Sequence, residues 1–154
     1  MTTLAGLWLT AAVLRQTELR RHHLAISRER QGDMPRDDIE VVRAAMGRAV
    51  RSLFAADVDV RKVTEFVANL RQRHGSKTPD VLEIEALIRS ELGESAVAVD
   101  DIPATTVLAA GMLVLSEVVD QTSMSEYQVS RLVAAAERDA VERGWRPLIV
   151  LDQQ

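Results

Sequence analysis

The stretch PATTVLAAGMLVLSEVVDQ, residues 103–121, decides the fold. Its middle part, Val107–Leu115, contains no polar side chain, so a helix formed there is apolar on every side and has to be buried. A bilayer span needs about 20 apolar residues. This run is shorter, and acidic residues such as Asp101 and Glu117 stand on both sides of it. The stretch therefore predicts the buried central helix of a helical protein that does not enter a membrane.

The composition is typical of one globular domain with a core of aliphatic side chains. The chain has 154 residues, of which 47% are hydrophobic, 27% charged and only 3% aromatic. This length is enough for one substantial core. The chain has no cysteine, which excludes disulfides and thiolate chemistry and agrees with a reducing cytoplasm. We therefore expect a cytoplasmic protein.

The net charge of −4 is divided unevenly along the chain. Residues 1–75 carry thirteen basic and nine acidic side chains, whereas residues 76–154 carry six basic and fourteen acidic ones. Such an asymmetry can orient a protein toward a charged partner or toward a second copy of itself. Solvated helix faces are the simpler explanation.

Helical periodicity extends over most of the remaining chain. The apolar spacing predicts further helices over residues 3–30, 35–54, 60–74, 80–92 and 123–143, with Phe54 and Phe66 facing the core. Thr78 is expected to cap the fourth of these helices in chain order, and Ser123 with Glu126 has the spacing of a capping box. Residues 94–102 have no helical period.

The C-terminal segment Trp145–Leu151 is predicted to be an apolar tail that packs over the core. Its β-branched residues also allow a short strand, paired with residues 96–99 or with another chain. The expected fold is therefore all-α: a single domain, residues 1–154, with about six helices around residues 103–121 and a short apolar tail. Residues 1–75 and 95–154 are its candidate sub-halves.

The N-terminal helix combines an apolar seam with basic residues. No positive charge precedes residues 4–14, so they do not have the pattern of a signal peptide. A terminal amphipathic helix often docks on a partner chain, and we expect this one to form a homodimer and to help bind a protein partner. The predicted interface consists of Leu4, Leu7, Trp8, Ala11, Leu14, Trp145, Leu148 and Val150.

The sequence contains no complete constellation for catalysis or metal binding. Glu18 and His22 are one helical turn apart, but two ligands do not make a metal site. There is no Gly-x-Ser-x-Gly elbow and no glycine-rich phosphate loop. The acidic residues of the helix over 80–92, among them Glu83 and Glu85, are those of a solvated face. We expect no enzymatic activity, no metal and no cofactor, with carboxylate catalysis as a residual alternative.

Residues Glu117–Leu132, EVVDQTSMSEYQVSRL, resemble the helix-turn-helix of repressor-type DNA-binding proteins. The resemblance implies that the second helix lies in the major groove of DNA. Ser123 stands where the family prefers glycine, and Val119 stands where it prefers alanine. The proposed recognition helix also has more acidic than basic residues, although phosphate contacts require basic ones. The implied DNA contacts are Ser125, Glu126, Tyr127, Gln128, Ser130 and Arg131.

Two functional hypotheses follow from these patterns. The first is a non-enzymatic interaction, assembly or regulatory protein that self-associates and binds a protein partner. The second is a transcriptional regulator that binds DNA through residues 117–143.

Overall fold

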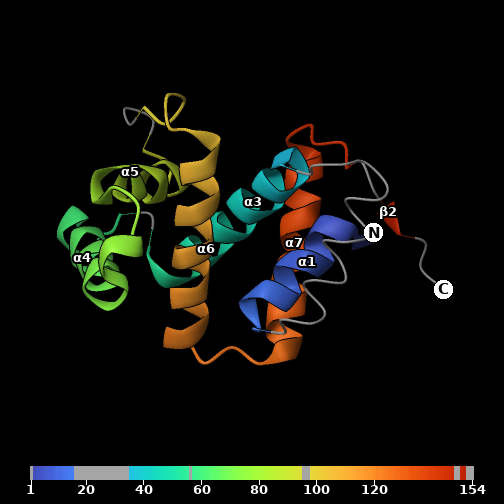
Figure 1. Ribbon diagram of the computed structural model, residues 1–154, viewed down its shortest axis with the longest axis horizontal. Helices are drawn as coiled ribbons and strands as arrows, with labels where there is room; N and C mark the ends of the chain where they lie inside the picture. Colours follow the sequence, from blue (N-terminus) through green and yellow to red (C-terminus); the bar gives the residue numbers. More distant parts are fainter. Residues whose placement is uncertain (1, 16–34, 56, 95–97, 148–149, 152–154) are drawn as a thin grey trace. The chain divides into compact units, whose positions relative to one another are not determined.

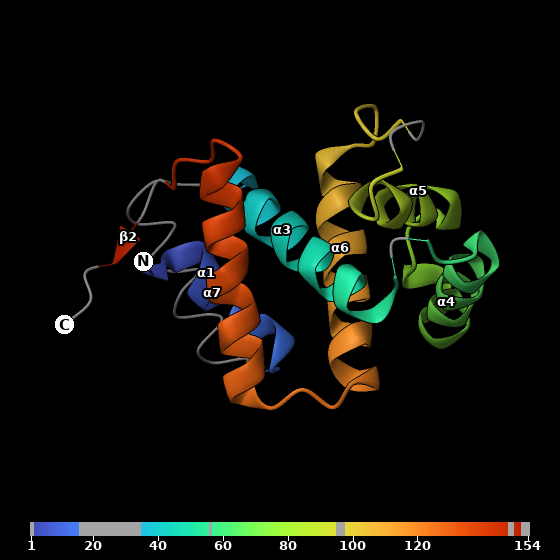
Figure 2. The same cartoon turned by 180° about the vertical axis from the view of Figure 1, so that it is seen from behind.

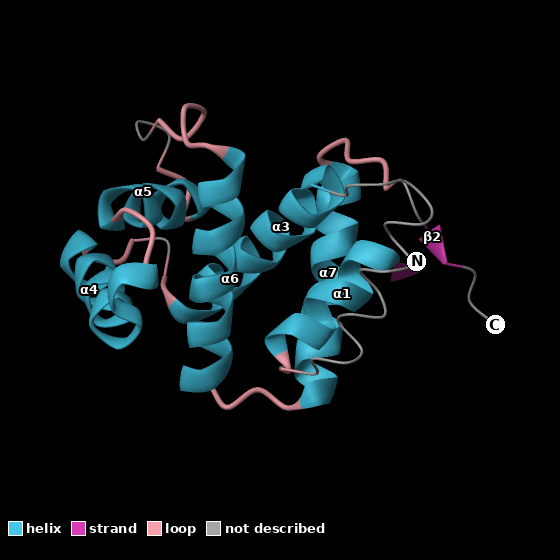
Figure 3. Ribbon diagram, in the orientation of Figure 1, coloured by secondary structure: helices cyan, strands magenta, loops and turns pink. Residues whose placement is uncertain are grey.

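The computed structural model describes residues 2–15, 35–55, 57–94, 98–147 and 150–151. The described residues form six α-helices: α1 Leu4–Val13, α3 Pro35–Leu53, α4 Val60–His74, α5 Val81–Glu91, α6 Ala104–Gln121 and α7 Glu126–Glu142 (Figure 1, Figure 3). A short 3-10 helix, η1 (Gly75–Lys77), follows α4, and β1 (Thr2–Thr3) and β2 (Val150–Leu151) are strands of two residues each. The predicted all-α fold with about six helices is confirmed.

The chain divides into two compact units. We call Met46–Gln121 the middle unit, and we call Met1–Ala45 together with Thr122–Gln154 the terminal unit. The boundary falls within α3, and both ends of the chain belong to the same unit. The boundaries of these units differ from those of the predicted sub-halves, residues 1–75 and 95–154. The sub-halves stay a prediction.

In the terminal unit, α1 packs against α7 (Figure 2). Strand β1 pairs antiparallel with β2, so that Thr2 lies opposite Leu151 and Thr3 opposite Val150. The side chain of Thr3 also caps α1 by accepting a hydrogen bond from the backbone N–H of Gly6. The buried residues of α1 are Leu4, Ala5, Gly6, Trp8, Leu9, Ala11 and Val13.

Helix α1 is shorter than the sequence predicts. A helix was expected over residues 3–30, but α1 ends at Val13, and Arg15 has a φ of +60°. A residue in this left-handed conformation cannot continue a right-handed helix. The rest of the expected helix, residues 16–34, lies outside the described residues, and so does most of its basic patch.

Trp145 fixes the chain where it leaves α7. Its side chain is buried, and its indole Nε1 donates a hydrogen bond to Asp37 Oδ1 at 3.0 Å. The tail beyond it forms a short strand, Val150–Leu151, which pairs with Thr2–Thr3. The alternative partner, residues 96–99, lies partly outside the described residues. The backbone N–H of Thr3 also donates a hydrogen bond to Glu137 Oε2, which holds the start of α1 against α7.

In the middle unit, α4 packs against α5, and α6 packs against both (Figure 1). Helices α4 and α5 each begin after an aspartate: Asp59 accepts a hydrogen bond from Arg61 N at 2.9 Å, and Asp80 accepts one from Leu82 N at 2.8 Å. The expected cap at Thr78 is therefore wrong. A carboxylate is the better cap because it also interacts with the helix dipole.

Helix α6 is largely buried, but not on every side. Val114 and Val118 are fully buried, whereas Ala109 is exposed and Leu108 and Met112 are half-buried. The expectation that its apolar run is enclosed all round is therefore wrong. By length and a mean hydropathy of 1.2, α6 passes a test for a membrane span, with 44% of its residues buried. Since core helices pass the same test, a location outside membranes stays a prediction.

Candidate binding pocket

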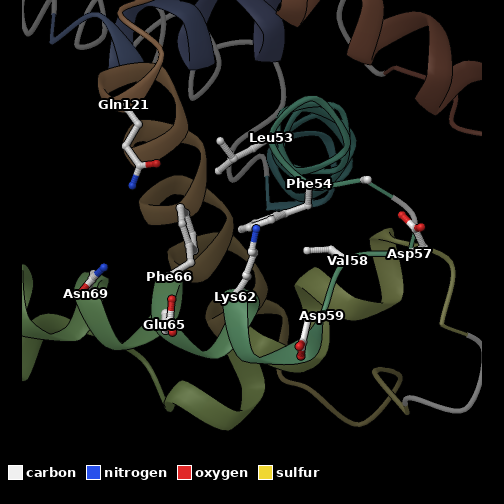
Figure 4. Close-up of a pocket in the computed structure, with 11 residues that line it drawn as sticks. Leu53, Phe54, Asp57, Val58, Asp59, Lys62, Glu65, Phe66, Asn69 and Gln121 are labelled. Atoms are coloured by element: carbon white, nitrogen blue, oxygen red, sulfur yellow. The ribbon is translucent and has the colours of Figure 1, made fainter.

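The middle unit contains a pocket with a volume of about 610 Å³ (Figure 4). One wall is the end of α3 with the connection to α4, a second is one face of α4, and Gln121 contributes from the end of α6. The lining residues are Leu53, Phe54, Ala55, Asp57, Val58, Asp59, Lys62, Glu65, Phe66, Asn69 and Gln121. The pocket is large enough for a side chain of a partner or for a small organic molecule.

The apolar surface of the pocket is built around two aromatic rings. Phe54 and Phe66 meet edge to face, with 5.6 Å between the ring centroids and an interplanar angle of 86°. Such a pair is stabilised by the quadrupoles of the rings in addition to the burial of their area. Leu53 and Val58 extend this surface and are half-buried. The pocket therefore offers a hydrophobic surface held in place by core packing.

Charged side chains surround this apolar surface. Asp57 and Asp59 precede α4, while Lys62 and Glu65 lie on its first turns (Figure 4). Asp59 already caps α4 and lies 3.9 Å from the guanidinium of Arg61. Within the described part of the chain, Asp57, Lys62 and Glu65 form no ion pair. The pocket thus has three acidic groups and one basic group at its edge.

Gln121 connects the pocket with a buried carboxylate. Glu117 is only 4% exposed. It accepts hydrogen bonds from Nη1 of Arg73 on α4 and, at 3.0 Å, from Nε2 of Gln121. The Arg73–Glu117 pair therefore links α4 to α6 and orients the amide of Gln121 at the edge of the pocket.

A second, smaller pocket of about 310 Å³ lies between the start of α4 and the end of α5. Arg89 Nε donates a hydrogen bond to Glu94 Oε2 at 2.7 Å, and this bond lowers the pKa of the Glu94 carboxyl. The two charges of this pair therefore neutralise each other. Since Val58 lines both pockets, the smaller one shares a wall with the larger one.

Four of the eight predicted interface residues are buried in the terminal unit. Leu4, Trp8, Ala11 and Trp145 are at most 7% exposed, whereas Leu7 and Leu14 are half-buried. Leu148 and the side chain of Val150 lie outside what the structure describes. The four buried side chains offer no surface to a partner in this structure, because the seam of α1 is buried within its own chain.

The turn before α7 differs from the predicted capping pattern. The capping box consists of Ser125 and Gln128, not of Ser123 and Glu126. Gln128 N donates to Ser125 Oγ at 3.2 Å, and Ser125 N donates to Gln128 Oε1 at 2.8 Å. Ser123 has a φ of +50°, so it cannot begin a right-handed helix. Its conformation is one that glycine adopts readily, and glycine is the residue that the resembled helix-turn-helix family prefers at this position.

The predicted DNA contacts lie on an exposed surface at the start of α7. All six are exposed: Ser125, Glu126, Tyr127, Gln128, Ser130 and Arg131. The guanidinium of Arg131 stacks 5.8 Å from the centroid of the Tyr127 ring. However, Gln128 is used by the capping box, α7 carries two arginines against four acidic residues, and α6 and α7 fall in different compact units.

No group of three or more metal-ligating side chains occurs among the described residues. Glu18 and His22 lie outside them. Of the acidic residues at α5, Asp80 caps the helix and Glu85 accepts a hydrogen bond from Thr64 Oγ1 at 3.0 Å. These acidic side chains therefore have structural roles.

The pocket was not predicted from the sequence. Phe54 and Phe66 are the only phenylalanines in the chain, and their positions on apolar helical stripes indicated two core residues. The scarcity of phenylalanine in this aliphatic chain was the one available signal. The contact between the two rings is visible only in the structure. Lys62, Asn69 and Gln121 gave no signal because each is polar and lies on an amphipathic helix.

Glu137 is a buried carboxylate outside the pocket, in the terminal unit. It is 5% exposed and accepts a hydrogen bond from the backbone N–H of Thr3 at 2.8 Å. Burial raises the pKa of Glu137 above its ordinary value of 4.5, although the hydrogen bonds from Thr3 oppose this shift. Ionisation of Glu137 therefore costs free energy in the folded state.

Glu137→Gln should remove a pH dependence of stability. The stabilising contribution of the protonated Glu137 is fully present below the unfolded-state pKa, near 4.5, and is lost as pH rises through the higher folded-state pKa. The free energy of unfolding of the wild type should thus fall relative to that of Glu137→Gln across this window. Urea denaturation of both proteins between pH 4 and pH 8 measures the difference, and a difference independent of pH would contradict the assignment.

Comparison with known proteins gave no relative of this chain. No protein-family model matches it, and no match was found among curated proteins or solved structures.

Proposed function

We propose that the protein is a non-enzymatic binding module whose middle unit accepts an apolar side chain of a protein partner. The observation that carries the proposal is the Phe54–Phe66 pocket, an apolar surface with a charged edge. Binding energy in protein interfaces is concentrated in apolar anchors that enter such pockets, while polar rims contribute orientation. Amphipathic segments that lie in a groove use the same arrangement.

The proposal is supported by how the pocket is built. Phe66 of α4 is 6% exposed and belongs to the core of the middle unit, so one side of the pocket is fixed before any partner binds. Phe54 and Val58 are only half-buried and are therefore accessible to a ligand. A largely preformed surface reduces the ordering cost of association.

A titration with N-acetyl-phenylalaninamide tests this function. In methyl NMR spectra of the full chain, we expect saturable shifts at Leu53 and Val58. The dissociation constant should be in the millimolar range, because a probe with about 15 heavy atoms and about 0.3 kcal/mol per atom binds no more tightly. The methyl groups of Leu82, which is 72% exposed and does not line the pocket, provide the control signals.

Two variants connect the shifts with the pocket. Val58→Ser should weaken binding several-fold, whereas Leu82→Ser, a similar apolar-to-polar change on α5, should leave it unchanged. Equal shifts at Leu82 and Val58, or no saturation at either, would refute the proposed pocket function.

Self-association is proposed as a second property and needs a direct measurement. Of the eight residues predicted for the interface, only Leu7 and Leu14 are described as partly exposed, so a dimer formed through α1 would use these two. Sedimentation velocity over a hundredfold range of protein concentration should show a dimer that Leu7→Glu weakens. A monomer at every concentration would remove self-association from the proposal.

DNA binding is the alternative function, and the conformation of Ser123 is the observation that favours it. We propose that any DNA contacts come from Tyr127, Ser130 and Arg131, since Gln128 is needed for the capping box. Retention of a mixed pool of genomic fragments should then fall steeply between low and physiological salt, because counterions are released on binding. Arg131→Ala should weaken retention while Arg138→Ala, a matched exposed arginine later on α7, has less effect. No retention at low salt would exclude this alternative.

A further inference from the structure

We infer that the partner segment which enters the Phe54–Phe66 pocket carries a basic residue next to its apolar side chain. This inference rests on the proposed function and specifies the chemistry of the partner. It is drawn from the charges at the edge of the pocket, since the apolar surface alone does not distinguish one hydrophobic segment from another.

The edge of the pocket is negatively charged. Asp57, Asp59 and Glu65 oppose a single lysine, Lys62. Part of the charge of Asp59 is balanced by the start of α4 and by Arg61, because Asp59 caps that helix. Even with Asp59 left out, the two remaining acidic groups exceed the one basic group.

The arrangement of these side chains leaves room for a cation. In Figure 4, Lys62 extends from α4 toward Phe54, with Glu65 farther along α4 and with Asp57 and Asp59 on the side of Val58. The lysine is thus flanked by acidic groups on both sides and can offset only one of them. Asp57 and Glu65 are exposed and form no ion pair with a described residue, so either can pair with an incoming arginine or lysine.

The aromatic ring at the entrance favours the same partner chemistry. Phe54 is half-buried and exposes part of its ring to the pocket. A guanidinium or ammonium group near an aromatic face is attracted to the ring quadrupole. An acidic partner segment would gain only the contact with Lys62 and would be repelled by the other three groups.

Three dipeptide probes separate the charge preference from the apolar contact. N-acetyl-Phe-Arg-amide, N-acetyl-Phe-Gln-amide and N-acetyl-Phe-Glu-amide share the same anchor and differ in charge. At about 20 mM salt, the arginine probe should bind roughly threefold more tightly than the glutamine probe, and the glutamate probe should bind most weakly. At about 0.5 M salt the three affinities should converge, because exposed charges are then screened. The shifts of the Leu53 and Val58 methyl groups report the affinity.

Charge-neutralising variants assign the preference to named groups. Glu65→Gln and Asp57→Asn should each reduce the advantage of the arginine probe, while Lys62→Met should increase it. Glu142→Gln, which removes an exposed carboxylate of the terminal unit, is the matched control and should change nothing. A preference that is undiminished in the double variant Asp57→Asn/Glu65→Gln would overturn the inference, because the acidic edge would then not be its source.

The outcomes distinguish the inference from the proposed function. If no probe shifts the Leu53 and Val58 signals, the pocket function itself is refuted. If all three probes bind with equal affinity, or the glutamate probe binds best, the pocket function stands and the basic partner is refuted. If raising the protein concentration alone shifts these signals, a second copy occupies the pocket and the inference is overturned.

Discussion

Replacing Gly6 with alanine should lower the free energy of unfolding by about 1–3 kcal/mol, the usual cost of overfilling a packed interior. A Cβ atom at this position would lie 2.7 Å from both Cδ and Oε1 of Glu137. The carboxyl group would have to move, and its hydrogen bond to Thr3 N would be lost. In an exposed helix, replacing glycine with alanine raises the free energy of unfolding by about 1 kcal/mol. A decrease would therefore indicate the contact between residue 6 and the carboxyl group of Glu137.

A double-mutant cycle provides the control. In the background Glu137→Ala the obstruction is gone, so Gly6→Ala should become neutral or stabilising there. Urea denaturation of the four proteins gives the coupling free energy between the two positions. An equal effect of Gly6→Ala in both backgrounds would show that Glu137 does not pack on Gly6.

The same arrangement occurs independently in the middle unit. A Cβ atom added at Gly47 of α3 would overlap Oε2 of Glu91 at the end of α5. Arg51 holds this carboxylate with a hydrogen bond of 3.1 Å. In each unit a helical glycine therefore allows a carboxylate from a second helix to approach closely.

Replacing Arg73 with methionine should destabilise the protein by about 2–3 kcal/mol. Loss of one partner leaves a buried charge uncompensated, which costs about 3–5 kcal/mol in a fully buried pair. Arg73 is itself 57% exposed, so water replaces part of its interaction and the expected effect is smaller. Glu117 would retain the hydrogen bond from Gln121 Nε2.

The double variant Arg73→Met/Glu117→Leu distinguishes a lost ion pair from lost packing. Without the buried carboxylate, most of the stability should return, because an apolar pair of similar volume often replaces a buried ion pair at no cost. Chemical denaturation of the wild type, Arg73→Met and the double variant measures the free energy of unfolding of each. Arg71→Met, an exposed arginine in the same last turn of α4, is the matched control and should change stability by less than about 0.5 kcal/mol. A double variant as unstable as Arg73→Met would contradict the role of the pair.

The sequence was sufficient to locate most helices and their buried faces. The apolar stripes of residues 35–54, 60–74 and 80–92 correspond to α3, α4 and α5 within two residues at each end. These features depend on a repeat of 3.6 residues and on caps that act within one turn. The cap positions were less well predicted, because Thr78 and Asp80, or Ser123 and Ser125, are close neighbours that can each cap a helix.

The candidate site could not be predicted in the same way. Phe54 and Phe66 were recognised as apolar positions, but an apolar position can face a closed core or an open pocket. Lys62, Glu65 and Gln121 become part of one surface only because α4 packs beside the ends of α3 and α6. The net charge at the edge of the pocket therefore depends on residues that no local sequence pattern groups together.

The sequence by itself determined that this chain forms helices, which face α3, α4 and α5 each bury and, through the run at 103–121, that one helix lies largely in a core. Only the tertiary structure decided that Leu4, Trp8 and Trp145 are buried within one chain. It also decided that Thr3 meets Glu137, 134 residues away, and that the pocket opens between three helices. The physical reason is range: helix periodicity and capping act over a few residues, whereas burial, pairing and pocket shape depend on which distant segments meet.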